Sequence, residues 1–551
     1  MHLADYIKKP RIQHCLVGVA LLILGFVLYY QTFTVGFLSD DWHAVSVVKD
    51  TNNIFQFFVT NIVGTTVGSS YGPFWNLALF VQYQLFHLQS VGYHVISILT
   101  MVTTALALYG FTRRLTRSFI IACGAGLLFL FVPSHVESVA WISGQPHLIA
   151  TALYVAALYC YSVFSSQKKV MYYVSACALA LGSLLTKEIG ISVIAIFFLI
   201  DVWFGTISSK KTELKKTLVH VLKYYLPLMV IFVLYMVMRR YTTGVVLGYY
   251  GSQSLIFSLQ EMIEMAIRMT VGLFLSYPLR ESVVLEIMSH IRIVAACIIV
   301  AYAGILWVCR KQVYSVVLIT LCYVASLVPY LTLHFNALSN EGERYTYVPS
   351  LFASLGIAYC LYVILNRFRG GRIIYGVVIV LIIVACIFPI QKKNNEWVQA
   401  GRIVRETLPT IEKLDLDLSK PIILVGLPDR IEGAQLFRNG TLLALELLGH
   451  GKFTGDRVLM APLLSDSYSE ETAVIDMRTC EDDVEALCVF SGEGKDHQFT
   501  GLPSVEMFDV KFTLEDFRKT DHTGEYIRIE GAIESANVVY FNHNAFQLFA
   551  K

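Results

Sequence analysis

Two adjacent carboxylates, Asp40 and Asp41, follow the first long apolar stretch of the chain, in the sequence Gly-Phe-Leu-Ser-Asp-Asp-Trp-His. That stretch, residues 14–34, is long enough to cross a bilayer, because ~20 apolar residues span ~30 Å of hydrocarbon. The pair is therefore expected at a membrane surface, where ionisable groups point to function. A carboxylate can act there as a general base that removes a proton from a hydroxyl group. The structural alternative is a solvated loop at the end of a helix.

Further charged and polar residues lie in loops that are expected on the same membrane face. These loops are 134–147, 186–190, 239–290 and 340–345. The cations among them are candidates for binding a phosphate group: Arg344, Lys187, Arg239 and Arg240. Arginine is the better geometric match, because its planar fork binds two phosphate oxygens at once. Two alternatives stay open, since Lys187 can pair with Glu188 in a tight turn and the two adjacent arginines can anchor to lipid headgroups.

The same loops, and the start of the predicted span 92–112 where His94 lies, hold candidates for binding an acceptor or another part of a substrate. They are Glu137, His135, His94, Glu188 and Tyr345. His135 and Glu137 stand two positions apart, and two such residues are not the signature of a metal site. Hydrogen bonds that hold the loop are the alternative for both of them. A histidine near the start of a span, such as His94, is more often structural.

The composition is that of a membrane protein with several spans. Apolar residues make up 56% of the 551 residues and charged residues only 15%, against ~25% in soluble domains. The mean hydropathy is +0.59. A net charge of +2 is too small to indicate binding to nucleic acid.

Apolar runs predict eleven crossings, which we expect as transmembrane helices. They fall near 14–34, 92–112, 118–133, 147–164, 170–186, 188–206, 218–238, 291–309, 313–334, 347–366 and 373–390. Two further apolar segments are ambiguous. Segment 73–88 is short, and 255–278 carries Glu261, Glu264 and Arg268, which fits a helix in the membrane interface.

The distribution of basic residues predicts the orientation. With the N-terminus inside, the inner loops carry far more lysine and arginine than the outer loops, as the positive-inside rule requires, provided that 255–278 does not cross. Asp40 and Asp41 then lie on the outer, extracytoplasmic face. The C-terminal region, from about residue 391, lies there as well.

This region, residues 391–551, has the composition of a soluble domain, whereas residues 1–390 form the membrane domain. Short strands are predicted at 421–427, 458–461, 473–476 and 538–541, and a helix at 433–448 with a possible interruption at Asn439-Gly440. We expect a small α/β or β-rich domain. Cys480 and Cys488 form one disulfide if the domain faces an oxidising compartment, or stay two buried thiols.

Six motifs in order resemble the membrane half of protein O-mannosyltransferase-like GT-C glycosyltransferases, in particular the TMTC and PMT groups. The motifs are Asp40-Asp41, Tyr71-Gly-Pro73, Gly92-Tyr-His94, His135-Val-Glu-Ser-Val-Ala-Trp-Ile-Ser-Gly144, Thr186-Lys-Glu-Ile-Gly190 and Glu343-Arg-Tyr-Thr-Tyr-Val-Pro-Ser350. The resemblance covers roughly residues 10–400. The chain departs from the family pattern at Gly72 and Gln145, where the family often has arginine, and its C-terminal domain does not match the helical repeats of TMTC proteins.

The resemblance implies a GT-C fold and transfer of a single sugar, usually mannose, from a polyprenyl- or dolichyl-phosphate carrier to an acceptor outside the cytoplasm, with inversion. Asp40 or Asp41 would be the base, and the cations would bind the lipid phosphate. No metal or other cofactor is needed in this scheme. The expected partners are membrane lipid, the lipid-linked donor and a protein or glycan acceptor.

Three alternatives remain. One is sugar transfer to a lipid or an envelope polysaccharide, and another is a non-catalytic assembly protein that kept the fold. The third is a transporter or flippase, which tends to show paired repeats and key polar residues in the middle of its spans. We find no such repeats, and the unusual polar residues are expected at one surface.

Overall fold

The computed structural model describes residues 10–64, 70–207, 214–245, 258–331, 339–431 and 433–449, and between 452 and 549 a set of strands with the few residues beside them. The chain divides into two compact units. The first comprises Met1–Tyr30, Val47–Leu88 and Gly92–Asn394, and the second Gln31–Ser46, Gln89–Val91 and Asn395–Lys551. The segment that bears the aspartate pair therefore belongs with the C-terminal region.

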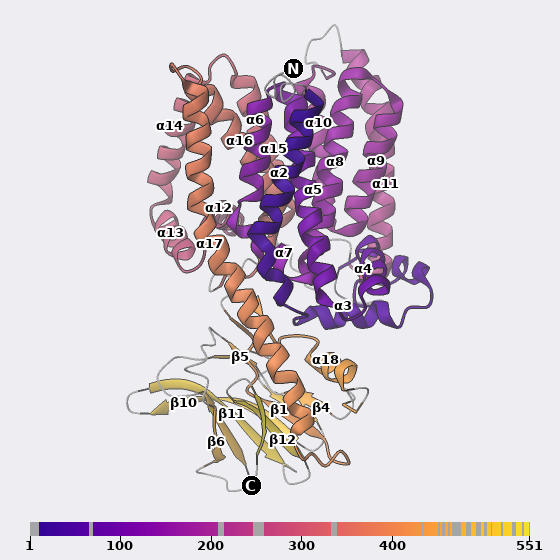
Figure 1. Ribbon diagram of the computed structural model, residues 1–551, viewed down its shortest axis with the longest axis vertical. Coiled ribbons are helices and arrows are strands. Elements are labelled where there is room, and N and C mark those ends of the chain that lie inside the picture. The colour runs from indigo at the N-terminus through magenta and orange to yellow at the C-terminus, as the bar shows by residue number, and fades with distance from the viewer. Residues whose placement is uncertain are drawn as a thin grey trace, which may run out of the picture. The chain divides into compact units, whose positions relative to one another are not determined.

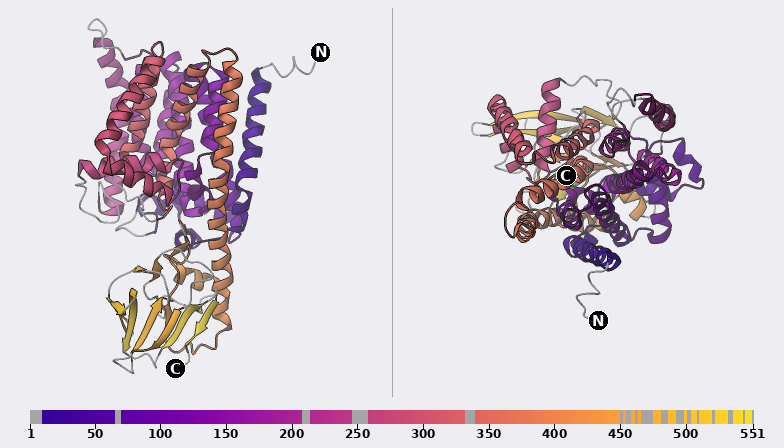
Figure 2. Two further views of the ribbon diagram at one scale, coloured as in Figure 1. Left: turned by 90° about the vertical axis from the view of Figure 1, so that its left-hand side faces the viewer. Right: turned by 90° about the horizontal axis from the view of Figure 1, so that it is seen from above.

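The first unit is a bundle of helices, many of which run side by side with roughly parallel axes (Figure 1; Figure 2). Its helices are α2 (Pro10–Tyr29), α4 (Pro73–Phe86), α5 (Ser90–Thr116), α6 (Phe119–Leu130), α7 (Val136–Ala140), α8 (Gln145–Gln167), α9 (Val170–Thr186), α10 (Val193–Trp203), α11 (Leu214–Thr243), α12 (Leu259–Gly272), α13 (Leu279–Ser289), α14 (Ile291–Val308), α15 (Val313–Leu327) and α16 (Tyr347–Leu365). A last helix, α17 (Gly371–Thr407), begins in the first unit and ends in the second.

Eight helices of the described chain are long and apolar enough to cross a membrane, or nine if the bent pair Phe119–Leu130 and Pro133–Ala140 is one span. Every predicted span contains a helix, but α6, α9 and α10 have only 12, 17 and 11 residues. Helix α6 ends before Pro133, because the residue before a proline avoids the helical conformation, and Val132 is extended. The count of eleven crossings therefore stays a prediction.

The two ambiguous segments form helices of 14 residues each, α4 and α12. Helix α12 starts with a capping box, in which Ser258 and Glu261 each accept a hydrogen bond from the other's backbone N–H. Both helices are too short for a straight crossing, which agrees with an interfacial position for 255–278. Residues 255–257 lie outside the described chain.

The second unit contains two larger sheets. Strand β1 (Ile422–Val425) lies parallel to β4 (Val458–Met460) and β12 (Asn537–Asn542), and β12 pairs antiparallel with β13 (Ala545–Leu548). The other sheet is antiparallel, in the order β6 (Ile475–Thr479), β7 (Leu487–Ser491), β11 (His522–Gly531), β10 (Val510–Lys519) and β9 (Ser504–Met507). Two short pairs complete the strands: β2 (Arg430–Ile431) with β3 (Ala434–Gln435), and β5 (Leu463–Ser465) with β8 (Gln498–Thr500).

Each predicted strand overlaps an observed one, although residues 461, 473 and 474 lie outside the described chain. The predicted helix at 433–448 is wrong in its first half, where the hairpin of β2 and β3 lies instead. Only α18 (Thr441–Leu448) is helical. It follows Gly440, whose φ of +72° breaks the run, because this backbone conformation favours glycine. Cys480 is disulfide-bonded, and the side chain of Cys488 lies outside the described residues.

Candidate active site

Glu137, which is buried, and Arg344, which is partly exposed, form an ion pair in the first unit. Glu137 lies on α7, the short helix after the break in α6, and Arg344 lies on the turn η8 (Glu343–Thr346). The Glu137 carboxylate accepts hydrogen bonds from the backbone N–H groups of Gly342 (3.2 Å) and Arg344 (2.7 Å). It also accepts one from the Arg344 guanidinium. Glu137 therefore holds the turn and its arginine in place, which is the structural alternative for this residue.

The Arg344 guanidinium is held against two aromatic rings as well. Its central carbon lies 5.2 Å from the ring centre of Trp141 and 4.8 Å from that of Tyr345. One of its nitrogens donates to the Tyr345 hydroxyl at 3.1 Å. The side chain keeps 16% of its surface exposed. A fixed and partly accessible guanidinium of this kind is suited to binding phosphate oxygens.

Lys187 and Arg239 form a second group of cations, around Glu188. The Lys187 ammonium lies 3.6 Å from the Glu188 carboxylate and donates to the Ser70 hydroxyl at 3.1 Å. Arg239 lies 3.9 Å from the same carboxylate. Burial opposes the ionisation of Glu188, but the charges of Lys187 and Arg239 outweigh it and hold the pKa of Glu188 below its ordinary value. Arg240, next in sequence, is exposed.

His147 and Tyr345 bring the two groups of cations together. The ring centres of His147 and Tyr345 lie 5.8 Å apart, and Tyr330 lies 6.0 Å from Tyr345. Lys187 directly precedes the turn η5 (Glu188–Ser192), which packs on α8, the helix of His147, and on η7 (Val328–Tyr330), the turn of Tyr330. We therefore group Arg344 and Lys187 with these rings as one candidate site, the cation-lined site. Sequence analysis missed His147, because a single histidine at the start of a helix gives no sign of its neighbours.

A network of buried ion pairs supports η8, the turn that carries Arg344. Glu343 lies 2.6 Å from the Lys393 ammonium and 3.6 Å from the Arg280 guanidinium. Arg280 also binds Glu281 at 2.9 Å, which in turn pairs with Arg268 at 3.0 Å. The side chains of Glu343, Lys393 and Arg280 are at most 3% exposed. Sequence analysis did not propose these pairs, which join α13, η8 and α17 across the chain.

In the second unit, the two aspartates have different environments. Asp41 is 1% exposed, and its carboxylate accepts the backbone N–H of Leu38 at 2.9 Å. Asp40 is half-buried at the start of α3 (Asp40–Lys49), and its Oδ1 accepts the side-chain amide of Asn439 at 2.7 Å. In the described chain, Oδ2 of Asp40 accepts no hydrogen bond. Asp40 is therefore the more accessible of the two carboxylates.

The C-terminal domain holds the aspartate segment directly. The Ser39 backbone N–H donates to the carbonyl of Leu436 at 3.1 Å, and its hydroxyl donates to Gln435 at 3.1 Å. A Cβ at Gly440 would lie only 2.5 Å from the Ser39 carbonyl oxygen. Glycine is thus required at 440 both for its positive φ and for this close approach. Sequence analysis recognised the Asn439-Gly440 turn but not its contact with the segment 400 residues earlier.

The two remaining histidine candidates are core residues. His135 is fully buried, its Nε2 lies 2.8 Å from the Ser350 hydroxyl, and its ring packs on Tyr347 at 4.3 Å. His94 is fully buried in the first turns of α5. Within the described part of the chain, no three His, Cys, Asp or Glu side chains are grouped so that they could hold a metal ion.

No protein-family model matches the chain. It is similar over 187 residues to protein O-mannosyl-transferase Tmtc1 of Drosophila melanogaster, with 27% identity over 32% of this chain and 22% of that protein. Protein O-mannosyl-transferase F38B6.6 of Caenorhabditis elegans is 28% identical over 27% of this chain and 24% of its own length. Human protein O-mannosyl-transferase TMTC2 is 26% identical over 33% of this chain and 23% of its length. The matches span less than a quarter of these relatives.

Two solved structures share 13% sequence identity with the chain. The oligosaccharyltransferase of Archaeoglobus fulgidus in its apo form has a TM-score of 0.46, over 82% of this chain and 65% of that one. ArnT from Cupriavidus metallidurans in its apo state also has a TM-score of 0.46, over 80% of this chain and 85% of that one.

Proposed function

We propose that this protein is an integral membrane glycosyltransferase that moves a single sugar, with mannose as the expected case, from a polyprenyl-phosphate carrier to a protein hydroxyl group. The reaction would take place on the extracytoplasmic face and invert the anomeric carbon. The names of the curated relatives support the class of reaction. The observation that carries the proposal is the partly exposed Arg344 guanidinium, which is fixed by Glu137 and two aromatic rings and belongs to the same candidate site as Lys187.

Arg344 and Lys187 are suited to stabilising the leaving group. The bond between the anomeric carbon and the phosphate oxygen breaks, and its electron pair stays on the lipid phosphate. The negative charge that grows there is stabilised by fixed cations that need no rearrangement. Arg344 would bind two phosphate oxygens through its fork, and Lys187 would add a second charge. Of the other two candidates, Arg239 supports this group through Glu188, and the exposed Arg240 is better placed to anchor to lipid headgroups.

We assign the general base to Asp40. It takes the proton of the acceptor hydroxyl while the oxygen forms the new bond to the anomeric carbon, so no metal is needed. Its half-buried carboxylate is available, whereas that of Asp41 is buried against the Leu38 backbone. That the aspartates face the same membrane side as Arg344 remains a prediction from the distribution of basic residues.

Two features of the remaining chain support the proposal. Tyr345 and Glu188 have polar groups at the cation-lined site and are the best candidates for contacting sugar or acceptor hydroxyls. Cys480 is disulfide-bonded, and disulfides persist in oxidising compartments, which favours an extracytoplasmic C-terminal domain. That domain would position the aspartate segment and bind acceptor.

A transfer assay tests the proposal. The purified full chain is incubated with radiolabelled polyprenyl-phosphate-mannose and peptides that contain serine and threonine. The Arg344→Gln variant is compared with Arg240→Gln, which removes the same charge from an exposed side chain. We expect labelled peptide from the wild type and Arg240→Gln, and about 100-fold less from Arg344→Gln, as for the loss of one transition-state donor. Equal rates in both variants would contradict the assignment, and label found only in lipid or polysaccharide would favour the alternative acceptors.

A further inference from the structure

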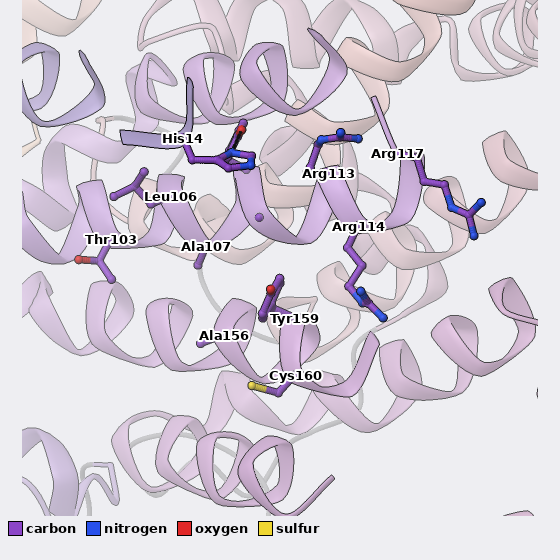
Figure 3. Close-up of a pocket in the computed structure, with 12 residues that line it drawn as sticks. His14, Thr103, Leu106, Ala107, Arg113, Arg114, Arg117, Ala156, Tyr159 and Cys160 are labelled. Atoms are coloured by element: carbon purple, nitrogen blue, oxygen red, sulfur yellow. Dashed lines mark hydrogen bonds between the residues drawn. The ribbon is translucent and has the colours of Figure 1, made fainter. Parts of the chain in front are cut away.

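A pocket of about 790 Å³ lies in the first unit between α2, α5 and α8. Figure 3 shows three arginines near one end of it, Arg113, Arg114 and Arg117, where α5 ends, with Thr103 and Leu106 toward the other end. None of these residues takes part in the proposed sugar transfer.

The pocket is at the opposite end of the bundle from the cation-lined site. Helix α8 contributes His147 to that site in its first turn, and Tyr159 and Cys160 to the pocket. With a rise of ~1.5 Å per residue, His147 and Cys160 are about 20 Å apart along the helix axis. The pocket therefore belongs to the other membrane face, which the charge bias predicts to be cytoplasmic.

The three arginines are available to bind an anion. Arg113 and Arg114 are half-buried and Arg117 is exposed. Arg114 donates a hydrogen bond to the neutral hydroxyl of Ser166. Within the described chain, none of the three forms an ion pair with a carboxylate. Three guanidinium groups without a counter-charge, at the end of a membrane helix, match the phosphate of a lipid headgroup.

The rest of the pocket fits a hydrocarbon chain. Its walls include Leu106, Ala107 and Ala156, which are apolar or small. It is open at the side of the bundle, because Thr103 and Tyr159 are both exposed. Along α5, Thr103 and Arg113 are separated by about 15 Å. This length is close to half of the ~30 Å hydrocarbon thickness of a bilayer, so one acyl chain of one leaflet could lie along it.

We propose that this pocket binds an anionic phospholipid, with the phosphate on Arg113, Arg114 and Arg117 and one acyl chain along Leu106 and Ala107. The hydroxyl of Tyr109, which lies 2.6 Å from the His14 ring, provides a further polar group beside the headgroup. The lipid is a bound partner of the fold, and its binding does not depend on the proposed transfer reaction.

Lipid binding to the purified full chain is measured by native mass spectrometry and by titration with phosphatidylglycerol or phosphatidylcholine in detergent. We expect phosphatidylglycerol to bind the wild type more tightly than phosphatidylcholine. The triple variant Arg113→Gln, Arg114→Gln, Arg117→Gln should bind phosphatidylglycerol 10- to 100-fold more weakly, because each basic residue near an anionic lipid contributes roughly fivefold. Ala156→Trp should also weaken binding, since it fills the groove and leaves the arginines in place.

The matched control is the triple variant Arg367→Gln, Arg369→Gln, Arg372→Gln, which removes the same charge from another basic loop and does not line the pocket. Its affinity for phosphatidylglycerol should stay within about threefold of the wild type. The proposal is overturned if this control loses as much affinity as the pocket variant. It is equally overturned if Ala156→Trp binds as the wild type does, or if soluble glycerol phosphate displaces the lipid at the same concentration.

Discussion

The two ends of the helical bundle hold their cations differently. At the end that contains Arg344, the cations Arg344, Lys187 and Lys393 are largely buried, and each lies against a carboxylate. At the other end, Arg113 and Arg117 are half-buried or exposed, and in the described chain neither has a carboxylate partner. Apart from the number of basic residues, the two ends therefore differ in the burial and the pairing of their cations.

This difference agrees with our proposal that sugar transfer takes place at the end that contains Arg344. A buried ion pair gains little stability, because taking two charges out of water costs about as much as their attraction returns. Such pairs are therefore expected where function requires fixed charges. Exposed arginines at a helix end need no such partner and suit reversible binding to lipid.

The largest expected effect is a loss of stability when a buried ion pair is broken at the end of the bundle that contains Arg344. Lys393→Met leaves Glu343 without its closest cation, 2.6 Å away, and should lower the free energy of unfolding by about 3–5 kcal/mol. Thermal unfolding of the purified chain measures this. The double variant with Glu343→Gln should recover most of the loss. If Lys393→Met is as stable as Arg117→Gln at the other end, the two ends do not differ as we describe.

A smaller effect is expected when the shape of the Arg344 side chain changes but its charge does not. Arg344→Lys loses the planar guanidinium group that Glu137 and the rings of Trp141 and Tyr345 hold in place. We expect sugar transfer to fall by about 100-fold, or ~2.7 kcal/mol, with little change in thermal stability. The equivalent change at the other end, Arg113→Lys, should leave transfer unchanged. Equal effects of both substitutions would show that charge alone matters.

Two adjacent arginines of α11 test whether the burial of an arginine determines how much it contributes to stability. Arg239 is 4% exposed and lies 3.9 Å from Glu188, whereas Arg240 is exposed. We expect Arg239→Gln to cost about 1–2 kcal/mol of stability, as for a buried charged hydrogen-bonding group. Arg240→Gln should stay within about 0.5 kcal/mol of the wild type. Denaturation of both variants checks the difference, and a reversed order would contradict the structure.

The smallest expected effect is a dependence of stability on pH that arises from Glu188, at the end of the bundle that contains Arg344. Glu188 lies in η5 (Glu188–Ser192), outside the eight candidate spans. Its pKa lies below the ordinary value, because Lys187 and Arg239 outweigh the effect of burial. The contribution of the ionised Glu188 carboxylate to the free energy of unfolding is therefore complete above the ordinary pKa of about 4.3. It is lost as the pH falls through the lower pKa that Glu188 has in the folded state. The difference in Tm between the wild type and Glu188→Gln should shrink in that range. The triple arginine variant at the other end should show no such trend.

The helical membrane domain was predictable because hydropathy reports directly on burial in lipid. All eleven predicted segments contain a helix, and the predicted strands of the C-terminal region overlap observed ones. The lengths of α6, α9 and α10 were not predictable, because breaks at Pro133 and at the turn before α10 shorten helices whose composition stays apolar.

The candidate site was predictable only in part. Loop position made Arg344, Lys187 and Asp40 candidates, since charges at the ends of spans are rare in an apolar chain. It did not identify Lys393, which lies one turn after Pro389 within α17 and pairs with a residue 50 positions away. Contacts of this kind depend on tertiary packing, which periodicity does not encode. For the same reason, sequence alone did not distinguish Asp40 from Asp41.

The most direct test of the central claim compares those two aspartates. Sugar transfer from labelled polyprenyl-phosphate-mannose is measured for Asp40→Asn and Asp41→Asn, with thermal unfolding of each variant, and the exposed Asp50→Asn as control. We predict that Asp40→Asn transfers 10²- to 10⁴-fold more slowly at unchanged stability, as expected for loss of a general base. Asp41→Asn should mainly lower stability. Transfer by Asp40→Asn at the rate of Asp50→Asn would contradict the account.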